Sequence, residues 1–191
     1  MIKPLAMTGL ALAALLSTAA IAGNGYGYGY GYGSSEYEDR GFYIGGSAGE
    51  IFYKEQGLDT IVPSVAFLNL GVKFNPYLAV EGRVGGGIVD DESRGYRVDV
   101  PLVYGGYLKG MLPVSPWFAP YAIAGVGGLQ LHRNYPDFNA DDVAFSFGLG
   151  GEFLLYGGAR IHAEWARIDH GNNEGYTYTA DQLSVGVSFR L

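Results

Sequence analysis

The sequence predicts an all-β fold, an eight-stranded antiparallel up-and-down transmembrane β-barrel. Apolar and polar residues alternate with a period of two in eight segments, the connectors between these segments are alternately short and long, and an export signal precedes them. Period-two alternation is typical of strands with one apolar and one polar face. Closing such strands into a barrel lets them cross a bilayer without an unpaired edge.

Residues 1–22 are predicted to be a secretory signal peptide. Lys3 gives a positive start, an apolar run follows, and Ala20-Ile21-Ala22 forms a small-x-small cleavage site. The uncharged run 4–23 also permits a membrane-spanning helix. The cleavage site, and the lack of a basic flank after it, favour the signal peptide, so we expect the mature chain to begin near Gly23.

Residues 23–40 are predicted to be a Gly/Tyr-rich periplasmic tether. Glycine and tyrosine alternate over residues 25–33, and residues 36–40 are rich in charge. Such composition is typical of flexible linkers. A sticky aromatic interaction segment is the alternative interpretation.

The barrel is expected over residues 41–191. Each predicted strand shows period-two alternation and is bounded by turn-forming or polar residues. The predicted strands are residues 41–54, 64–74, 78–89, 99–113, 118–132, 142–155, 159–167 and 182–191.

The connectors predict the direction of the barrel. Residues 75–77, 115–117 and 156–158 are short and rich in proline and glycine, which favours tight turns. The other connectors, after the first, third, fifth and seventh strands, are longer and polar; they are residues 55–63, 90–98, 133–141 and 168–181. Outer-membrane barrels have short periplasmic turns and longer external loops, so both mature termini are expected in the periplasm.

The apolar face is expected to point towards lipid. In the last strand Leu183, Val185, Val187, Phe189 and Leu191 share one side. A soluble lipocalin-like barrel or sandwich would show the same alternation with the apolar face inside. Aromatic residues near the short turns favour the membrane barrel, because they would form an interfacial girdle. These residues are Phe74, Tyr77, Trp117, Phe118, Tyr121, Phe153 and Tyr156.

Composition excludes several functions. The formal net charge is -7, which disfavours nucleic acid as a partner. The chain has no cysteine, and its Gly-x-Gly patterns lie within predicted strands rather than before a helix. We therefore expect no cofactor, no metal site and no catalytic residue.

Charged residues on the polar faces predict a network inside the barrel. Arg160, His162 and Glu164 are spaced two apart on one strand. A His162–Glu164 general-base pair is one interpretation. We favour a structural network, because side chains fill an eight-stranded barrel and buried charge needs partners. The predicted members are Glu81, Arg83, Lys109, Glu152, Arg160, His162, Glu164 and Arg190.

Residues 41–191 resemble the small outer-membrane β-barrels related to the transmembrane domain of outer membrane protein A. Residues 41–49, 119–127 and 179–187 carry the resemblance. It implies an outer-membrane location, lipid and lipopolysaccharide as neighbours, and a role in adhesion, serum resistance or envelope stability. A surface ligand is not identified. The peptidoglycan-binding domain of larger relatives does not follow here, so cell-wall anchoring is not carried over.

The chain end is similar to the assembly signal that the outer-membrane insertion machinery reads. Its residues here are Ser184, Gly186, Phe189 and Leu191. Leu191 replaces the phenylalanine usual in the family, which weakens this resemblance.

We expect a non-enzymatic integral outer-membrane protein with an envelope-structural or surface-interaction role. A narrow channel for ions or very small solutes is the alternative. A lipid A-modifying enzyme is a third hypothesis, since His170-Gly171-Asn172-Asn173 faintly resembles the His-x-Ser-Asn segment of lipid A deacylases. Asn172 takes the place of the nucleophilic serine there, and an amide is not an activated nucleophile.

Overall fold

The computed structural model describes residues 40–55, 62–89, 91–93, 96–134, 137–155, 158–173 and 176–191. The predicted signal peptide and all of the predicted tether except Arg40 lie outside these ranges and stay predictions. No helix within these ranges has the length and hydropathy that crossing a bilayer requires.

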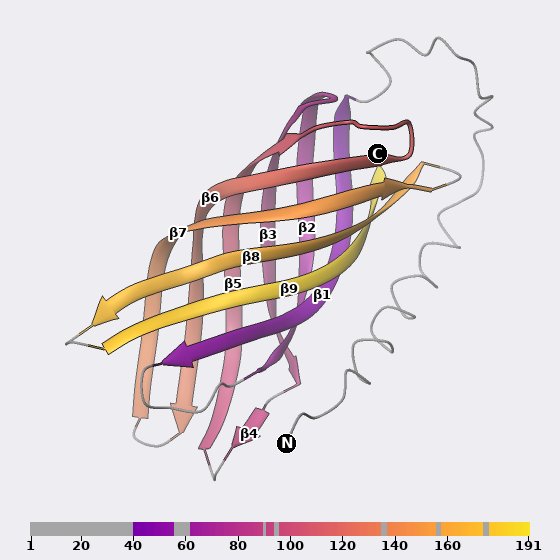
Figure 1. The fold of residues 1–191 in the computed structure, drawn as a ribbon. Helices are drawn as coiled ribbons and strands as arrows, with labels where there is room; N and C mark the ends of the chain where they lie inside the picture. Colours follow the sequence, from indigo (N-terminus) through magenta and orange to yellow (C-terminus); the bar gives the residue numbers. More distant parts are fainter. Residues whose placement is uncertain are drawn as a thin grey trace.

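The described strands form one closed antiparallel barrel (Figure 1). The sheet order is β3-β2-β1-β9-β8-β7-β6-β5-β4, and the additional pairing of β3 with β5 closes the ring. The strands are β1 Gly41–Glu55, β2 Ser64–Asn75, β3 Leu78–Val89, β4 Asp91–Ser93, β5 Tyr96–Met111, β6 Phe118–Asn134, β7 Asp137–Leu154, β8 Ala159–Asn173 and β9 Tyr176–Arg190. The predicted fold class is confirmed.

We call the end where β2–β3, β5–β6 and β7–β8 connect the short-turn end. At the first of these turns the Tyr77 amide donates a hydrogen bond of 2.8 Å to Asn75 Oδ1. At the second, Ser115 and Phe118 form a bridge. At the third, Gly158 has a φ of 82°, a left-handed conformation that glycine adopts without strain. Both ends of the barrel sequence, Gly41 and Leu191, lie at this same end.

The opposite end, which we call the hairpin end, differs from the prediction. The ladder of β6 and β7 continues to Asn134 opposite Asp137, and that of β8 and β9 to Asn173 opposite Tyr176. The expected loops 133–141 and 168–181 were wrong, since they are mostly strand. Backbone pairing holds such hairpins together, so these residues need no strict apolar alternation.

The short strand β4 was also missed. It pairs with the start of β5, from Asp91 opposite Val98 to Ser93 opposite Tyr96. The run is polar and only three residues long, so it carries no apolar alternation from which a strand could be predicted.

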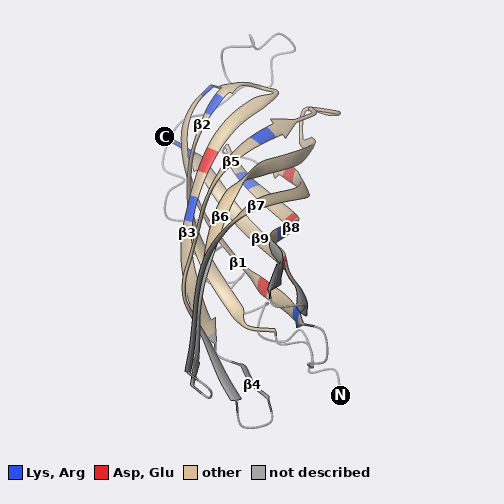
Figure 2. Ribbon diagram, turned by 90° about the vertical axis from the view of Figure 1, so that its left-hand side faces the viewer, with Lys and Arg blue, Asp and Glu red and all other residues tan. Residues whose placement is uncertain are grey.

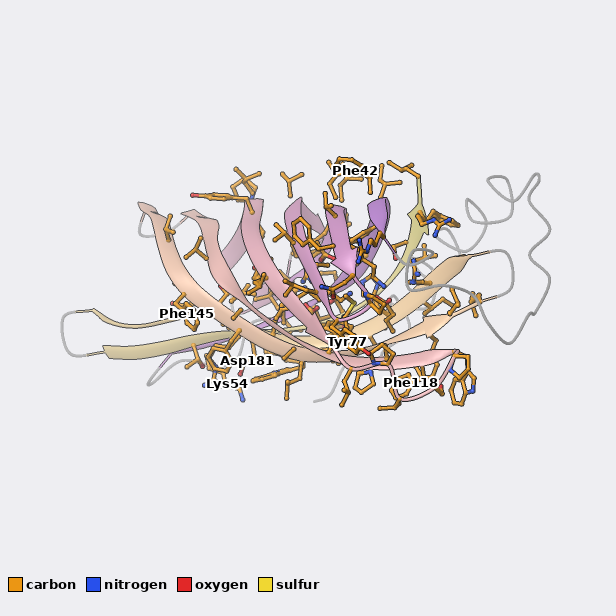
Figure 3. All side chains as sticks on the ribbon, turned by 90° about the horizontal axis from the view of Figure 1, so that it is seen from above. Phe42, Lys54, Tyr77, Phe118, Phe145 and Asp181 are labelled. Atoms are coloured by element: carbon orange, nitrogen blue, oxygen red, sulfur yellow. The ribbon has the colours of Figure 1, made fainter. Side chains whose placement is uncertain are left out.

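The two faces of the barrel wall point in the predicted directions. On β7, Val143, Phe145 and Leu149 are 63%, 57% and 62% exposed, whereas Ser146 and Glu152 on the other face are buried. Figure 3, which looks at the barrel from above, labels Phe42 and Phe145 among the side chains on the outside of the wall. The apolar face points outward and the polar face inward, so the lipocalin-like alternative is wrong.

Aromatic side chains gather on the outside at the short-turn end. The rings of Trp117 and Phe153 are stacked with centroids 6.0 Å apart, and Phe118 lies 4.6 Å from Phe153. Tyr121, which we expected in this girdle, is buried inside the barrel, because the alternation of β6 turns it inward with Ile123. Tyr156, also expected there, lies outside the described residues.

Packing inside the closed barrel leaves no room for a side chain at Gly71. A Cβ atom there would overlap the ring of Tyr43, whose hydroxyl is fixed by a 2.6 Å hydrogen bond to Glu81. We expect Gly71→Val to lower the free energy of unfolding by about 1–3 kcal/mol. The urea midpoint should fall accordingly. Gly110 faces outward, and a Cβ atom added there would meet nothing within 4 Å, so Gly110→Val is the matched control.

The measurement is the fraction of heat-modifiable band on an SDS gel after refolding in detergent over a urea series. Equal midpoints for the two variants would contradict the proposed overlap.

Candidate functional site

The candidate site is the polar interior in the half of the barrel nearest the short turns. Alternate residues of each strand point inward, and closure brings together side chains from β2, β3, β5, β7 and β8. In Figure 2 the blue and red segments of these strands lie along the wall of this half. The side chains form two clusters, one around Glu152 and one around Arg83.

Glu152 on β7 is surrounded by three cations. Its Oε1 atom lies 2.8 Å from Lys73 Nζ and 3.2 Å from Arg160 Nε, and its Oε2 atom lies 3.0 Å from Lys109 Nζ. Lys109 Nζ also lies 3.9 Å from the centre of the Tyr121 ring. Glu152, Lys73 and Lys109 are all buried. One carboxylate therefore joins strands β2, β5 and β8 to β7.

Arg83 on β3 bridges two carboxylates. Its Nε atom donates to Glu81 at 2.6 Å, while Nη1 and Nη2 donate to the two oxygens of Glu164 at 2.5 and 2.9 Å. This bidentate geometry is the strongest arrangement that arginine offers a carboxylate. The Tyr43 hydroxyl donates to the other Glu81 oxygen at 2.6 Å, and the guanidinium lies 4.8 Å from the Tyr107 ring centre.

His162 is buried inside the barrel, and Glu164 is ion-paired with Arg83. Both oxygens of Glu164 accept hydrogen bonds from Arg83, so this carboxylate is held in an ion pair across the barrel. His162 is buried, and its ring lies against Gly186 of the neighbouring strand β9. A general-base pair needs an oriented imidazole next to a nucleophile in an accessible site, and this histidine is enclosed by the network.

Arg190 differs from the other predicted members. It lies on the inward-facing register of β9, but it is the last residue of that strand and is exposed. The alternation in sequence was right, but the position at the barrel mouth removes the burial that we expected. Glu81, Arg83, Lys109, Glu152, Arg160, His162 and Glu164 are brought together within the barrel.

Sequence reasoning missed Lys73 and the interior tyrosines. Lys73 shares its face of β2 with Asn69 and Gly71, so the alternation of the predicted strand 64–74 contained the signal. Tyr43 and Tyr107 gave no such signal, because a tyrosine fits a lipid interface as well as an interior.

The other half of the interior, towards the hairpin end, is mainly apolar, with the buried Gln182 opposite Ile51 as a polar member. Its inward side chains Ile51, Val65, Phe67, Val103 and Ile168 are buried in one cluster, which we call the apolar layer. Between the layer and the ion pairs, Asn69 donates to Ser47 at 3.2 Å and Ser146 donates to the Ile168 carbonyl at 2.8 Å. Side chains thus pack against one another in the described interior at both levels.

The predicted assembly signal lies on β9 and the residue after it. Ser184 and Gly186 face inward and are buried. Phe189 is half-buried, and Leu191 is exposed with its amide 2.9 Å from the Phe42 carbonyl. This hydrogen bond extends the pairing of β9 with β1 to the last residue of the chain.

The described residues contain no group of three metal-ligating side chains. Seven acidic residues in or beside the long connectors expected from sequence belong to strand extensions or lie outside the described ranges, and their side chains are not described. They are Asp90, Asp91, Glu92, Asp141, Asp142, Asp169 and Glu174. The same applies to the side chains of residues 170–173, where the lipid A deacylase comparison was made. In the described interior, cationic side chains are paired with carboxylates from other strands.

Comparison with known proteins gives one family and several structures. The family model described as outer membrane protein beta-barrel domain matches residues 8–190. Neisserial surface protein A is 14% identical with a TM-score of 0.57, over 78% of this chain and 97% of that chain. No curated protein matches the chain.

Two further solved structures share the fold. The attachment invasion locus protein Ail of Yersinia pestis, in complex with the heparin analogue sucrose octasulfate, is 16% identical with a TM-score of 0.56, over 78% of this chain and 99% of that chain. The N-terminal β-barrel domain of Pseudomonas aeruginosa OprF is 12% identical with a TM-score of 0.52, over 79% of this chain and 100% of that chain.

The buried ion pairs of Glu152 and the more exposed Arg167–Asp181 pair are predicted to differ in their contribution to stability. We expect Glu152→Gln to lower the free energy of unfolding by about 3–5 kcal/mol, because it removes the carboxylate that buried Lys73 and Lys109 and half-buried Arg160 share. The Arg167–Asp181 pair near the hairpin end is 34% and 18% exposed with a shortest N–O distance of 2.8 Å. Asp181→Asn should cost only about 0–1 kcal/mol.

The two variants are compared by urea unfolding in lipid vesicles, followed by tryptophan fluorescence. Equal losses would show that Glu152 has no special role in holding the strands together.

Proposed function

This chain belongs to the outer membrane protein β-barrel family, and on that premise we propose that it is a non-catalytic membrane scaffold that displays long hairpins for surface interaction. Its transmembrane barrel structure and outer-membrane location follow from the family and the fold.

The observation that carries the proposal is the asymmetry between the two ends. At the hairpin end two ladders continue as paired strands, to Asn134–Asp137 and Asn173–Tyr176. At the short-turn end the chain returns directly at Asn75–Leu78. Long paired hairpins on a filled barrel suit a protein whose outer surface meets partners. We propose that this end faces outward, with a cleaved signal peptide and both mature termini in the periplasm.

Charge supports a basic partner. Residues 54–63, 90–99, 132–142 and 167–181, which make up or join the strand ends at the hairpin end, contain twelve Asp or Glu and five Lys or Arg. Ail has been solved with a heparin analogue, which is a polyanion. An acidic surface repels polyanions and attracts basic ligands. We therefore propose a surface ligand with exposed cationic groups rather than a sulfated glycan.

The remaining partners in this proposal are those of the membrane itself. Lipid and lipopolysaccharide surround the wall, and the insertion machinery reads the end of β9. The inward Ser184 and Gly186 and the terminal Leu191 support the second assignment, since they form the seam with β1.

A narrow channel is opposed by the apolar layer, because its side chains fill the lumen. We expect planar-bilayer recordings of the refolded chain to show no conductance steps above background. A Val65→Gly/Phe67→Gly variant removes two side chains of the layer and should introduce small steps if the layer is the barrier. Steps in the unaltered chain would favour the channel.

Surface interaction is tested with the protein in nanodiscs over immobilised poly-L-lysine and heparin. We expect binding to poly-L-lysine that weakens as salt is raised, and none to heparin. The variant Asp137→Asn/Asp141→Asn/Asp142→Asn should bind more weakly. Its control, with glutamate at the same three positions, keeps the charge and should bind normally. Tighter binding to heparin would contradict the proposal.

A further inference from the structure

The interior has an excess of positive charge at the short-turn end. The charged side chains described there on the inward face are the carboxylate Glu152 and the cations Lys73, Lys109, Arg160 and Arg190. Figure 2 shows blue segments of several strands at this end, where the label C lies. The deeper cluster around Arg83 has the opposite balance, since this arginine lies between two carboxylates. An anionic partner at the mouth would therefore be stabilised.

Two of these cations are accessible from the short-turn mouth. Lys73 and Lys109 are buried, whereas the Arg160 side chain is 12% exposed and Arg190, the last residue of β9, is exposed. Arg160 lies opposite Ser188, so Arg190 is the next inward residue on the neighbouring strand. Such diagonal neighbours on one face of a sheet lie about 7–8 Å apart. The two arginines can therefore bind neighbouring carboxylates of one short segment.

The chain enters the barrel beside these arginines. Gly41, the first residue of β1, lies opposite Lys73, and Tyr43 lies opposite Arg190. Residues 36–39, which we call the acidic segment, precede the described part of the chain and read Glu-Tyr-Glu-Asp. A chain spans at most about 3.6 Å per residue, so the backbone of the whole segment lies within about 18 Å of Gly41. Its three carboxylates are thus kept at a high effective concentration beside the cationic mouth.

The backbone of Gly41 indicates a change of chain direction at this point. Its φ is 127°, whereas residues of antiparallel strands have a φ of about −140°. A Cβ atom there would meet nothing within 4 Å, so backbone conformation rather than crowding favours glycine. The chain before Gly41 consequently does not continue the line of β1.

We propose that the acidic segment lies across the short-turn mouth and pairs its carboxylates with Arg160 and Arg190. These carboxylates offset the positive charge that Glu152 by itself leaves at this end. The contact holds the Gly/Tyr-rich residues 25–33 at the opening of the barrel. It lies at the opposite end from the hairpins, so it does not depend on the surface partner proposed above.

A free oxyanion such as phosphate is the competing occupant, because it carries the same sign of charge. The acidic segment is favoured because it is covalently attached beside the site. Binding within one chain avoids most of the translational and rotational entropy that a free ligand loses.

The test measures the distance between the end of the acidic segment and the far side of the mouth. The chain has no cysteine, so Ser34→Cys and Val114→Cys introduce two spin labels at chosen positions in chain 23–191. Val114 is 57% exposed and lies between β5 and β6, across the ring from β1. The protein is held as single copies in phosphatidylcholine nanodiscs, and distances are measured by pulsed electron paramagnetic resonance. We expect a narrow distribution at low salt that broadens as salt is raised.

Variants with altered charge identify the ion pairs. Glu36→Gln/Glu38→Gln/Asp39→Asn should lower the ratio of docked to undocked chains about tenfold, corresponding to about 1.4 kcal/mol. The control Glu36→Asp/Glu38→Asp/Asp39→Glu keeps the charge and should keep the narrow distribution. Arg190→Glu should broaden the distribution, and adding Glu38→Arg to it should narrow the distribution again. The heat-modifiable band on an SDS gel shows that each variant has folded.

A broad distribution at low salt with the acidic segment unaltered would overturn the proposal. A narrow distribution that the neutral variant retains would also overturn it, as would failure of the exchanged charge pair to restore the narrow distribution. A broad distribution in chloride buffer, together with phosphorus-NMR line broadening of added phosphate that Arg190→Glu abolishes, would assign the mouth to a free oxyanion instead.

Discussion

The structure depends on closure of the backbone ladder between β3 and β5. A bilayer offers no water to peptide groups, so a sheet that crosses it must have no free edge. Every other pairing joins two strands that follow one another in the chain, or joins the first strand β1 to the last strand β9. Only the β3–β5 pairing turns this row of strands into a ring. It is also where Gly82 and Gly106 face each other and where pairing is interrupted above Gly85. The β7–β8 ladder likewise stops at Phe147–Arg167, although both strands continue beyond it towards the hairpin end.

Closure determines how charge must be arranged inside. A narrow barrel lined by Lys73, Lys109, Arg83 and Arg160 tolerates these cations only if carboxylates reach across it. Glu152 and Glu164 come from strands on the far side of the ring from β3, and Tyr43 fixes the remaining carboxylate, Glu81. These contacts bind strands that share no ladder, so the network acts as a set of internal crosslinks. The apolar layer then fills the half of the lumen that has no such charges.

The interior and the hairpin end consequently differ in composition. Ion pairs and apolar side chains occupy the described interior, whereas the sequence that forms the hairpin end has an excess of Asp and Glu. A barrel of this kind contributes a rigid frame, and differences among relatives are expected in the hairpins and along the wall. Ail and Neisserial surface protein A share the fold at 16% and 14% identity.

The sequence by itself determined the faces, the turns and the strand order, because alternation and turn residues act over a few positions. It identified seven residues of the interior network, yet it placed Arg190 inside and Tyr121 in the outer girdle, and it treated two hairpin ladders as loops. Only the tertiary structure decided which charges meet. Lys73 and Glu152 are 79 residues apart in sequence. Their contact depends on the stagger of the strands around the closed ring, and local sequence patterns do not determine this stagger.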